Sequence, residues 1–211
     1  MPMDEKRIFR KQQKQERNRL EVIDATVTLF YKKGYTGVTV PEIARAVEFG
    51  VGTLYRLFPG GKEDIYHAMQ EIVVNAFEEK IETFMAGVED EVEIIRQYIR
   101  AAGAVYGAYP KQMAMYLRDT AGVGLDLGYG LETSLAHRYR ACAEHVEKAI
   151  RKGEENGRFK SFPPGAAVMC LRTMINGFFI NFQAAGETVS IGENSELIEA
   201  FFLDGLMNGK R

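Results

Sequence analysis

The sequence has only two cysteines, Cys142 and Cys170, among its 211 residues. Because both stand in apolar stretches, they exclude a disulfide framework and a zinc finger. No run of about 18 uncharged apolar residues occurs, so the sequence predicts no transmembrane helix. The first residues are charged and polar, unlike a secretory signal. We therefore expect a cytoplasmic protein that has no membrane partner and builds its core without disulfides or metal.

Catalytic and cofactor-binding motifs are also missing. The three histidines, His67, His137 and His145, form no HExxH or related ligand set. His137 and His145 are two helical turns apart, which is too far for joint binding of one metal ion. No nucleophile elbow or phosphate loop occurs, and Gly122-Val123-Gly124 follows no strand, so it is not a dinucleotide-binding turn. The sequence predicts that the chain is not an enzyme and binds no cofactor and no metal.

The net charge of −2 conceals an uneven distribution. Residues 1–62 contain 12 Lys or Arg and 7 Asp or Glu, whereas the remainder contains 15 basic and 22 acidic residues. A basic segment on an acidic body indicates that only the N-terminal part meets a polyanion. Seven basic residues and one acid, Glu16, lie between Lys6 and Arg19. Such an arm can follow DNA phosphates or enter a minor groove, but its first half also fits a disordered, solvated tail.

Apolar residues recur at helical spacing along almost the whole chain, and no segment has a convincing strand pattern. This pattern predicts an all-α fold of about nine helices, with a domain over residues 1–66 and a second over 67–211. Four glycines between Gly122 and Gly130 predict a flexible loop. The predicted helices cover about 17–33, 39–47, 51–58, 62–84, 92–106, 110–117, 131–156, 164–186 and 195–207.

Two short helices joined by a tight turn stand out between residues 39 and 58. Thr39 can cap the first helix, Pro41 suits its first turn, and Glu42 can close a capping box. A helix, a turn of about three or four residues and a second short helix make a helix-turn-helix unit, whose second helix enters the DNA major groove. The alternative is an ordinary αα-hairpin, which is common in helical proteins.

A specific series of residues runs through this segment. Ile43-Ala44-Arg45-Ala46 is followed by Gly52-Thr53-Leu54-Tyr55, and then by Phe58 and Lys62-Glu63. This series resembles the TetR family of bacterial transcriptional regulators, closely over residues 17–66 and by the order of its helices beyond them. The family usually has glycine, valine and serine in the turn, where this chain has Glu48-Phe49-Gly50. Gly50 therefore offers no side chain to cap the second helix.

Residue types suggest how this segment meets DNA. Thr53 and Tyr55 can donate hydroxyl hydrogen bonds to phosphates, and Lys62 at a helix N-terminus makes a good phosphate site. Val51 and Gly52 are placed to approach base edges, and Arg56 reaches a phosphate or a base, or stays in solvent. The resemblance also implies that Thr39 lies near the DNA backbone. Leu54, Leu57 and Phe58 are predicted to be core. The predicted DNA-binding residues are Thr39, Gly50, Val51, Gly52, Thr53, Tyr55, Arg56 and Lys62.

The two apolar helices after residue 163 carry hydrophobic residues on more than one face. This indicates burial on two sides, one of which can belong to a second copy of the chain. The TetR resemblance implies such a homodimer, because the last two helices of the family usually form a four-helix interface. The alternative is burial wholly within one chain. The predicted interface residues are Leu171, Met174, Phe178, Phe182, Phe201 and Phe202.

Aromatic and methionine residues gather in the middle helices and suit an adaptable apolar pocket with a few polar tips. The plainer interpretation of any one of them is core packing at helical spacing. His137 can meet an anionic group or lie in solvent. The predicted ligand-binding residues are Tyr98, Tyr106, Met113, Tyr116, His137, Tyr139 and Cys142.

Together, these patterns and the resemblance predict a homodimeric repressor that leaves a palindromic double-stranded DNA operator when it binds a small-molecule effector. The competing hypothesis is a DNA-binding scaffold, or a partner-controlled regulator, of the same fold without a small-molecule inducer. A core that cannot admit a ligand would favour this second hypothesis.

Overall fold

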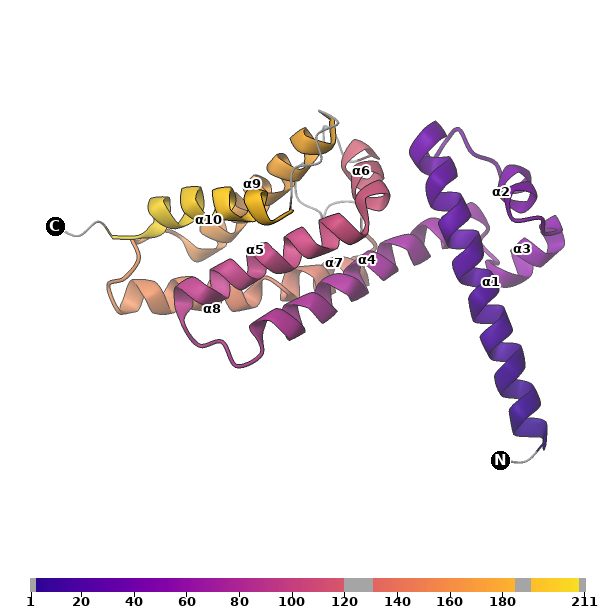
Figure 1. Cartoon of the computed structure of the whole chain (residues 1–211), viewed down its shortest axis with the longest axis horizontal. Coiled ribbons are helices and arrows are strands. Elements are labelled where there is room, and N and C mark those ends of the chain that lie inside the picture. Colours follow the sequence, from indigo (N-terminus) through magenta and orange to yellow (C-terminus); the bar gives the residue numbers. More distant parts are fainter. Residues whose placement is uncertain (1–2, 120–130, 185–190, 209–211) are drawn as a thin grey trace. The chain divides into compact units, whose positions relative to one another are not determined.

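The computed structural model describes residues 3–119, 131–184 and 191–208, and in these ranges the chain is helical (Figure 1). The all-α prediction is confirmed. The β-structure in these ranges is limited to one isolated antiparallel bridge, between Phe159 and Met207. The ten helices are α1 (Met3–Lys33), α2 (Val40–Ala46), α3 (Val51–Leu57), α4 (Lys62–Met85), α5 (Glu91–Ala108), α6 (Pro110–Asp119), α7 (Thr133–Ala141), α8 (Glu144–Glu155), α9 (Pro164–Ala184) and α10 (Ile191–Leu206).

The predicted helices over 17–33 and 131–156 differ most from the observed ones. Helix α1 begins at Met3 instead of near Arg17, so the described part of the basic arm is helical. The helix predicted over 131–156 is divided into α7 and α8 at Cys142 and Ala143. There the amide of Ala143 donates to the carbonyl oxygen of Arg140, three residues earlier, instead of four residues earlier as in an α-helix. Both residues stay buried, so the apolar spacing continues across the break and hides it. The predicted glycine loop over 122–130 lies outside the described residues.

The chain forms two compact units, Met1–Glu71 and Ile72–Arg211. The first unit contains α1, α2, α3 and the start of α4. Its core joins one face of α1 to α2 and α3 and includes Val27, Phe30, Ile43, Leu54 and Phe58. Leu54 lies on α3 and Phe58 directly follows it, one helical turn later. Both side chains therefore point from the same side of α3 into this core.

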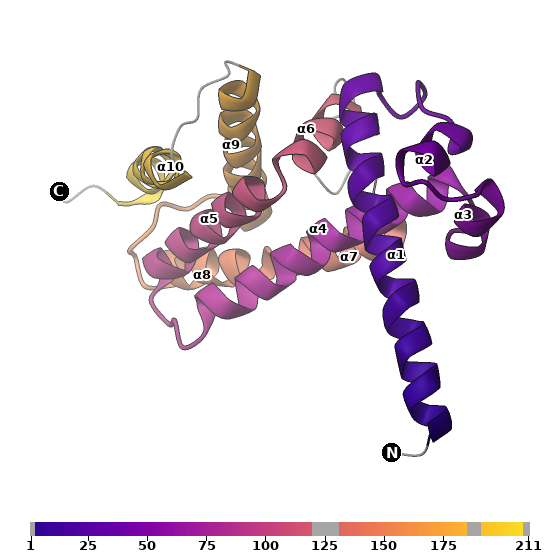
Figure 2. The ribbon, with the colours of Figure 1, turned by 45° about the vertical axis from the view of Figure 1, so that its right-hand side comes forward.

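The second unit is built around α5, which packs against α8 and α10 (Figure 1, Figure 2). Helix α9 contacts both α8 and α10. An ion pair crosses from α5 to α10, with Arg100 Nε 3.1 Å from Glu199 Oε1, although the two residues are 99 positions apart in the sequence. The second core is thus assembled from segments that are distant in the sequence.

The residues that follow α8 reverse the chain and return it to the core of the second unit. Gly157 has a φ of +75°, a left-handed conformation that glycine adopts without strain. The chain then returns Phe159 to the core, where its ring lies against Gly153. A Cβ atom on residue 153 would lie 2.1 Å from Phe159 Cδ2, so no side chain fits there.

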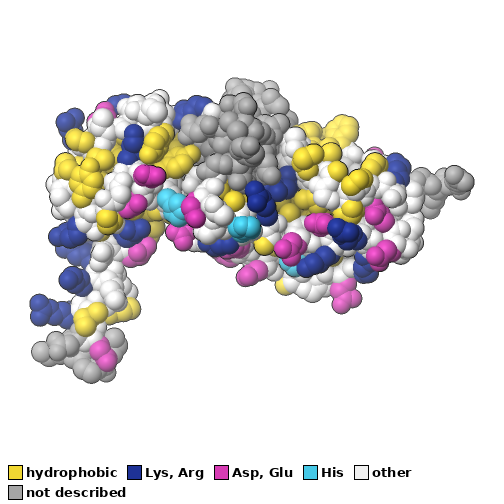
Figure 3. All heavy atoms as spheres, turned by 180° about the vertical axis from the view of Figure 1, so that it is seen from behind, with side chains coloured by type: hydrophobic (Ala, Val, Ile, Leu, Met, Phe, Trp, Pro, Cys, Tyr) yellow, Lys and Arg dark blue, Asp and Glu magenta, His cyan; other side chains and the backbone are white. Residues whose placement is uncertain are grey.

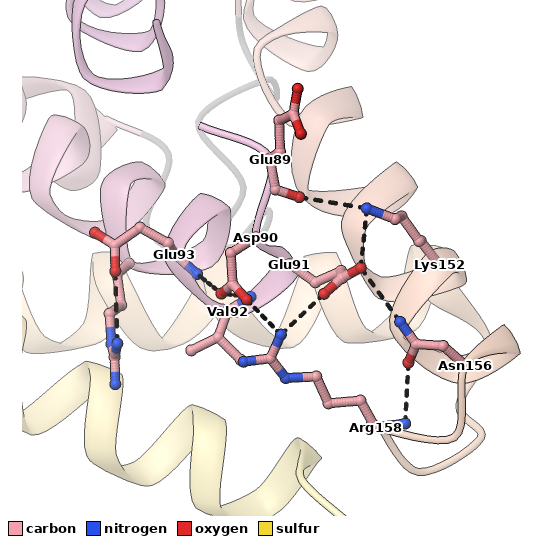
Figure 4. Close-up of polar contacts among 9 residues, drawn as sticks. Glu89, Asp90, Glu91, Val92, Glu93, Lys152, Asn156 and Arg158 are labelled. Atoms are coloured by element: carbon pink, nitrogen blue, oxygen red, sulfur yellow. Dashed lines mark hydrogen bonds and ion pairs between the residues drawn. The ribbon is translucent and has the colours of Figure 1, made fainter. Parts of the chain in front are cut away.

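A polar cluster fastens the start of α5 to the end of α8 (Figure 4). Asp90 caps α5 by accepting hydrogen bonds from the amides of Val92 and Glu93, both at 3.0 Å. The buried carboxylate of Glu91 lies 3.0 Å from Lys152 Nζ and 2.9 Å from Arg158 Nη1. Arg158 also pairs with Asp90. The cluster thereby gives a buried carboxylate two cationic partners, which offsets the cost of its removal from water.

Candidate nucleic-acid interface

The start of α2 is fixed by its capping residues. The amide of Thr39 donates to Glu42 Oε2 at 2.9 Å, and Thr39 Oγ1 accepts from the amide of Glu42 at 3.4 Å. The predicted capping box is therefore present. Lys33 Nζ, at the end of α1, donates to Glu42 Oε1 at 2.8 Å. The hydrogen bond from Lys33, together with those from the backbone and hydroxyl of Thr39, lowers the pKa of Glu42 to about 2.

The turn between α2 and α3 contains a residue in an unusual backbone conformation. Glu48 has a φ of +55°, in the left-handed region that glycine prefers. Its amide donates to Arg45 O at 3.2 Å, and the amide of Phe49 donates to Ala44 O at 2.9 Å. These two bonds define the Schellman ending of a helix, in which glycine usually occupies the left-handed position. In this chain, α2 has a Schellman ending with glutamate, Glu48, at the position that glycine usually occupies.

Helix α3 begins at Val51, and its N-cap residue, Gly50, provides no side-chain hydrogen bond, as the sequence predicted. The carbonyl oxygen of Gly50 accepts from the amides of Thr53 and Leu54 at 2.8 and 3.2 Å. A Cβ atom on Gly50 or on Gly52 would meet no other atom within 4 Å. Both glycines therefore face open space, where the backbone of α3 can be approached closely.

The two faces of α3 have different surroundings. Leu54, Leu57 and Phe58 are buried, so their predicted core role is confirmed. Val51 and Tyr55 are 40% and 47% exposed, and Arg56 is exposed beside them. Thr53 is half-buried. An outer surface of apolar, hydroxyl and cationic groups can contact thymine methyl groups, base edges and phosphates.

Lys62 has partners that the sequence did not reveal. Its ammonium group donates to the carbonyl oxygens of Tyr35 and Val38 at 2.9 and 3.0 Å. It also lies 4.3 Å from the centroid of the Tyr35 ring. Lys62 therefore holds the connection between α1 and α2 against the start of α4. An ammonium group has three donors, so one remains for a phosphate.

Arg19 supports α3, a role that the sequence reasoning missed by counting it with the basic arm. Its Nη1 donates to the carbonyl oxygen of Leu57, and its guanidinium carbon lies 4.3 Å from the centroid of the Phe58 ring. Leu57 is the last residue of α3, where carbonyl groups lack helical partners. The sequence did offer a signal for this role, because Arg19 stands directly before the apolar stripe of α1.

In the second unit, the structure brings most of the predicted ligand-binding residues together. Tyr98, Tyr106, Met113, Tyr139 and Cys142 belong to one buried cluster. His137 is exposed on α7. The side chain of Tyr116 lies outside the described residues. Burial, and then the nearby charge of Glu78, raises the pKa of the Cys142 thiol to about 12, so this thiol remains protonated at neutral pH.

Two polar residues of α9 join this cluster and were missed from the sequence. Asn176 is 1% exposed, and its Oδ1 accepts a hydrogen bond from the hydroxyl of Tyr106. The guanidinium carbon of Arg172 lies 4.5 Å from the centroid of the Tyr139 ring. The signal was present, because Arg172 and Asn176 are one helical turn apart in an otherwise apolar helix.

The predicted dimer residues occupy several environments. Leu171 and Phe202 are buried within the chain, and Met174 and Phe178 are half-buried. Phe201 is 64% exposed. The side chain of Phe182 lies outside the described residues. Among the side chains of α9 and α10 that the structure describes, the large apolar residues Met169, Leu197 and Phe201 face solvent.

Two further properties concern the ranges that the structure describes. None of their helices is both long enough and apolar enough to cross a membrane. No three His, Cys, Asp or Glu side chains in these ranges gather so that they could hold a metal ion.

Comparisons with known proteins identify the fold. Residues 22–69 match the family model for bacterial regulatory proteins of the tetR family. The chain is similar to PfmR, a TetR family transcriptional regulator from Thermus thermophilus, with a TM-score of 0.71 and 20% identity over 89% of this chain and 99% of that one. No curated protein matches the sequence significantly.

Two other solved structures add to this likeness. The fatty acid degradation regulator FadR from Bacillus halodurans has a TM-score of 0.67 and 19% identity, with 89% of this chain and 95% of that one covered. AibR, solved with isovaleryl coenzyme A and operator DNA, has a TM-score of 0.68 and 16% identity, with 87% and 96% covered. The resemblance noted in the sequence is therefore confirmed: residues 22–69 are a tetR-family helix-turn-helix segment, and the chain has the fold of a TetR-family transcriptional regulator.

Proposed function

We propose that this chain is a homodimeric repressor that binds a palindromic operator in the cytoplasm and leaves it when a small-molecule effector binds. The observation that carries the DNA-binding part is the outer face of α3. That face exposes Val51, Tyr55 and Arg56 beside a glycine with open space around it, while Leu54 and Leu57 fix the helix from behind. Exposed apolar and cationic groups on a rigid helix are what major-groove recognition requires.

The dimer is supported by the surface of α9 and α10. Leu197 and Phe201, one turn apart on α10, and Met169 on the neighbouring α9 each expose a large apolar side chain, and apolar residues that gather at a surface mark interaction sites. A two-fold axis through this surface would pair each patch with its own copy. The same axis would relate two recognition helices, so the operator would be a palindrome with half-sites roughly 34–36 Å apart.

The effector is supported by the buried polar groups of the second unit. Arg172 places a cation against the ring of Tyr139, and Asn176 places an amide against the hydroxyl of Tyr106. A mainly apolar or aromatic compound with a negative group would suit this combination. AibR was solved with an acyl coenzyme A and operator DNA together, and FadR is a fatty acid degradation regulator. Fatty acids and acyl thioesters are therefore the first compounds to test.

Release of the operator would follow from thermodynamic linkage between the effector site in the second unit and the DNA-binding site in the first. Helix α4 contributes residues to both units, because it extends from Lys62 to Met85 while the units divide after Glu71. An effector that binds more tightly to a dimer state with misplaced recognition helices shifts the population toward that state. Operator affinity then falls by the same factor by which DNA weakens effector binding.

The test begins with selection of operators from a random duplex library and measurement of affinity by fluorescence anisotropy. Tyr55→Phe should weaken binding by a similar factor on good and poor operators, because a phosphate contact carries no sequence information. Val51→Ala and Gly52→Ala should change which bases are preferred. Selection that enriches no palindrome would contradict the proposal.

Effectors would be sought among fatty acids and acyl thioesters by thermal shift, since a ligand of the native state raises the melting temperature. A true effector must also release the selected operator. Operator binding that persists with every compound would favour the alternative, a DNA-binding scaffold or a partner-controlled regulator without a small-molecule inducer.

A further inference from the structure

The N-terminal half of α1 has no partner within the first unit. Residues 5–17 are exposed throughout, and this part of the helix extends beyond α2 and α3 (Figure 1, Figure 2). Lys and Arg side chains line its outer edge (Figure 3). The helix is continuous with the part that packs in the core, so the position of this half is set by the rest of α1.

The cations of this segment lie on one side of the helix. At about 100° per residue, they fall within a sector of about 140°, and Glu5 and Glu16 lie outside it. Ile23, Val27 and Phe30, which pack in the core, lie on the opposite side of the same helix. We call this sector the α1 stripe, and its residues are Lys6, Arg7, Arg10, Lys11, Lys14 and Arg17.

The spacing of these charges matches that of a DNA strand. Residues 6–17 span about 17 Å at 1.5 Å per residue, which gives about one positive charge per 3 Å. One strand of B-DNA carries about one phosphate per 3.4 Å of axis. Among the described residues, none of the six cations forms an ion pair with a carboxylate. Six exposed charges at this spacing are complementary to a row of phosphates.

A membrane surface fits less well. A helix that lies on a bilayer needs a broad apolar face, and residues 5–17 contain only Ile8 and Phe9 as large apolar residues. We propose that the α1 stripe binds the phosphate backbone of DNA that flanks the half-site, outside the contacts of α3. The inference rests on the proposed DNA-binding function and adds a contact that does not depend on base sequence.

The test compares a stripe variant, Arg10→Gln with Lys14→Gln and Arg17→Gln, with a control variant, Gln12→Ala with Gln15→Ala. All five residues are exposed, and glutamine forms helices about as well as lysine and arginine, so both variants should fold. Circular dichroism would check this. The probes are the selected operator in a 40-bp duplex, the operator trimmed to its minimal length, and a random 40-bp duplex.

On both 40-bp duplexes, we expect the slope of log K against log salt to fall by about 2–3 in the stripe variant, since each lost phosphate contact removes about 0.9. The slope should stay almost unchanged in the control variant on every duplex, and in the stripe variant on the trimmed operator. An unchanged slope, or an equal loss on the trimmed operator, would overturn the inference. If binding to anionic lipid vesicles, measured in parallel, were weakened in the stripe variant while binding to the duplexes was not, the inference would also be overturned. Failure of the wild-type protein to bind any duplex would instead overturn the proposed function, and this inference with it.

Discussion

The ammonium nitrogen of Lys62 lies 4.3 Å from the centroid of the Tyr35 ring while it donates to the carbonyl oxygen of the same residue at 2.9 Å. A second bond to Val38 O completes the arrangement. This lysine was predicted from the sequence as a phosphate contact. Its observed partners give it a structural role within the first unit, which can be measured separately from DNA binding.

Lys62→Met should therefore reduce stability even without DNA. The substitution keeps most of the apolar stem but removes charged hydrogen bonds, each of which contributes about 1.5–3 kcal/mol. Because Lys62 is only half-buried, water replaces part of both bonds, and we expect less than their sum, a loss of about 1–3 kcal/mol in urea unfolding. If the remaining donor also meets a phosphate, the salt slope of operator binding should fall by about one. Unchanged stability with a reduced slope would show that the bonds to Tyr35 and Val38 contribute nothing.

Glu48→Gly should stabilise the protein. A side chain in the left-handed region costs roughly 1–2 kcal/mol, part of which glycine gives back through the greater entropy of the unfolded chain. We expect a net gain of about 1 kcal/mol, measured by denaturant unfolding. Glu48→Ala is the matched control, because it removes the same side-chain atoms beyond Cβ but keeps the strain. Equal gains from both substitutions would contradict the explanation.

Gly153→Ala should destabilise the second unit. The new methyl group would lie 2.1 Å from Phe159 Cδ2, and overpacking of this kind typically costs about 1–3 kcal/mol. Gly205→Ala in α10 is the control, because a Cβ atom there meets nothing within 4 Å. That change should stabilise by about 0.4–1 kcal/mol. Phe159→Leu, combined with Gly153→Ala, should recover part of the loss if the ring is the obstacle.

Glu42 should contribute to stability in a defined range of pH. Its folded pKa of about 2 lies below its ordinary value of 4.5, so the stabilisation by its carboxylate is complete above pH 4.5 and is lost as the pH falls toward 2. The difference in melting temperature between wild type and Glu42→Gln should therefore be constant at neutral pH and shrink in acid. Glu21→Gln, at an exposed site on α1, is the control. A difference that grows in acid would refute the role of the capping carboxylate.

Phe201→Glu should separate the proposed dimer into folded monomers. Phe201 is largely exposed in the single chain, so a charge there costs little within one protomer but would be buried without a partner in the interface. Light scattering at micromolar concentration measures the change. Ile8→Glu, at an exposed apolar residue of α1, should leave the oligomeric state unchanged. A wild-type protein that is already monomeric would exclude the homodimer.

Local signals in the sequence predicted the helices well, because apolar spacing and the pair Thr39 and Glu42 act over one or two turns. The break at Cys142 escaped prediction, since a single tighter turn hardly rotates the apolar stripe. The roles of Lys62 and Arg19 also escaped, because their partners, Val38 and Leu57, lie 24 and 38 residues away. Basic residues suggest phosphate contacts from sequence, and only tertiary structure shows that a carbonyl group or an aromatic ring competes for them.

The long separation between Arg100 and Glu199 has a consequence for the order of events during synthesis. Contacts within the first unit need no residue beyond Glu71, so this unit can fold as soon as it leaves the ribosome. The core around α5 must wait for α10, which is made much later and whose packing requires closure of a long loop. During that interval, the face of α5 that receives Ile198 and Leu203 is bare. A nascent chain therefore has a folded DNA-binding segment before its second core is closed, and chaperones that cover apolar helices would act on α5.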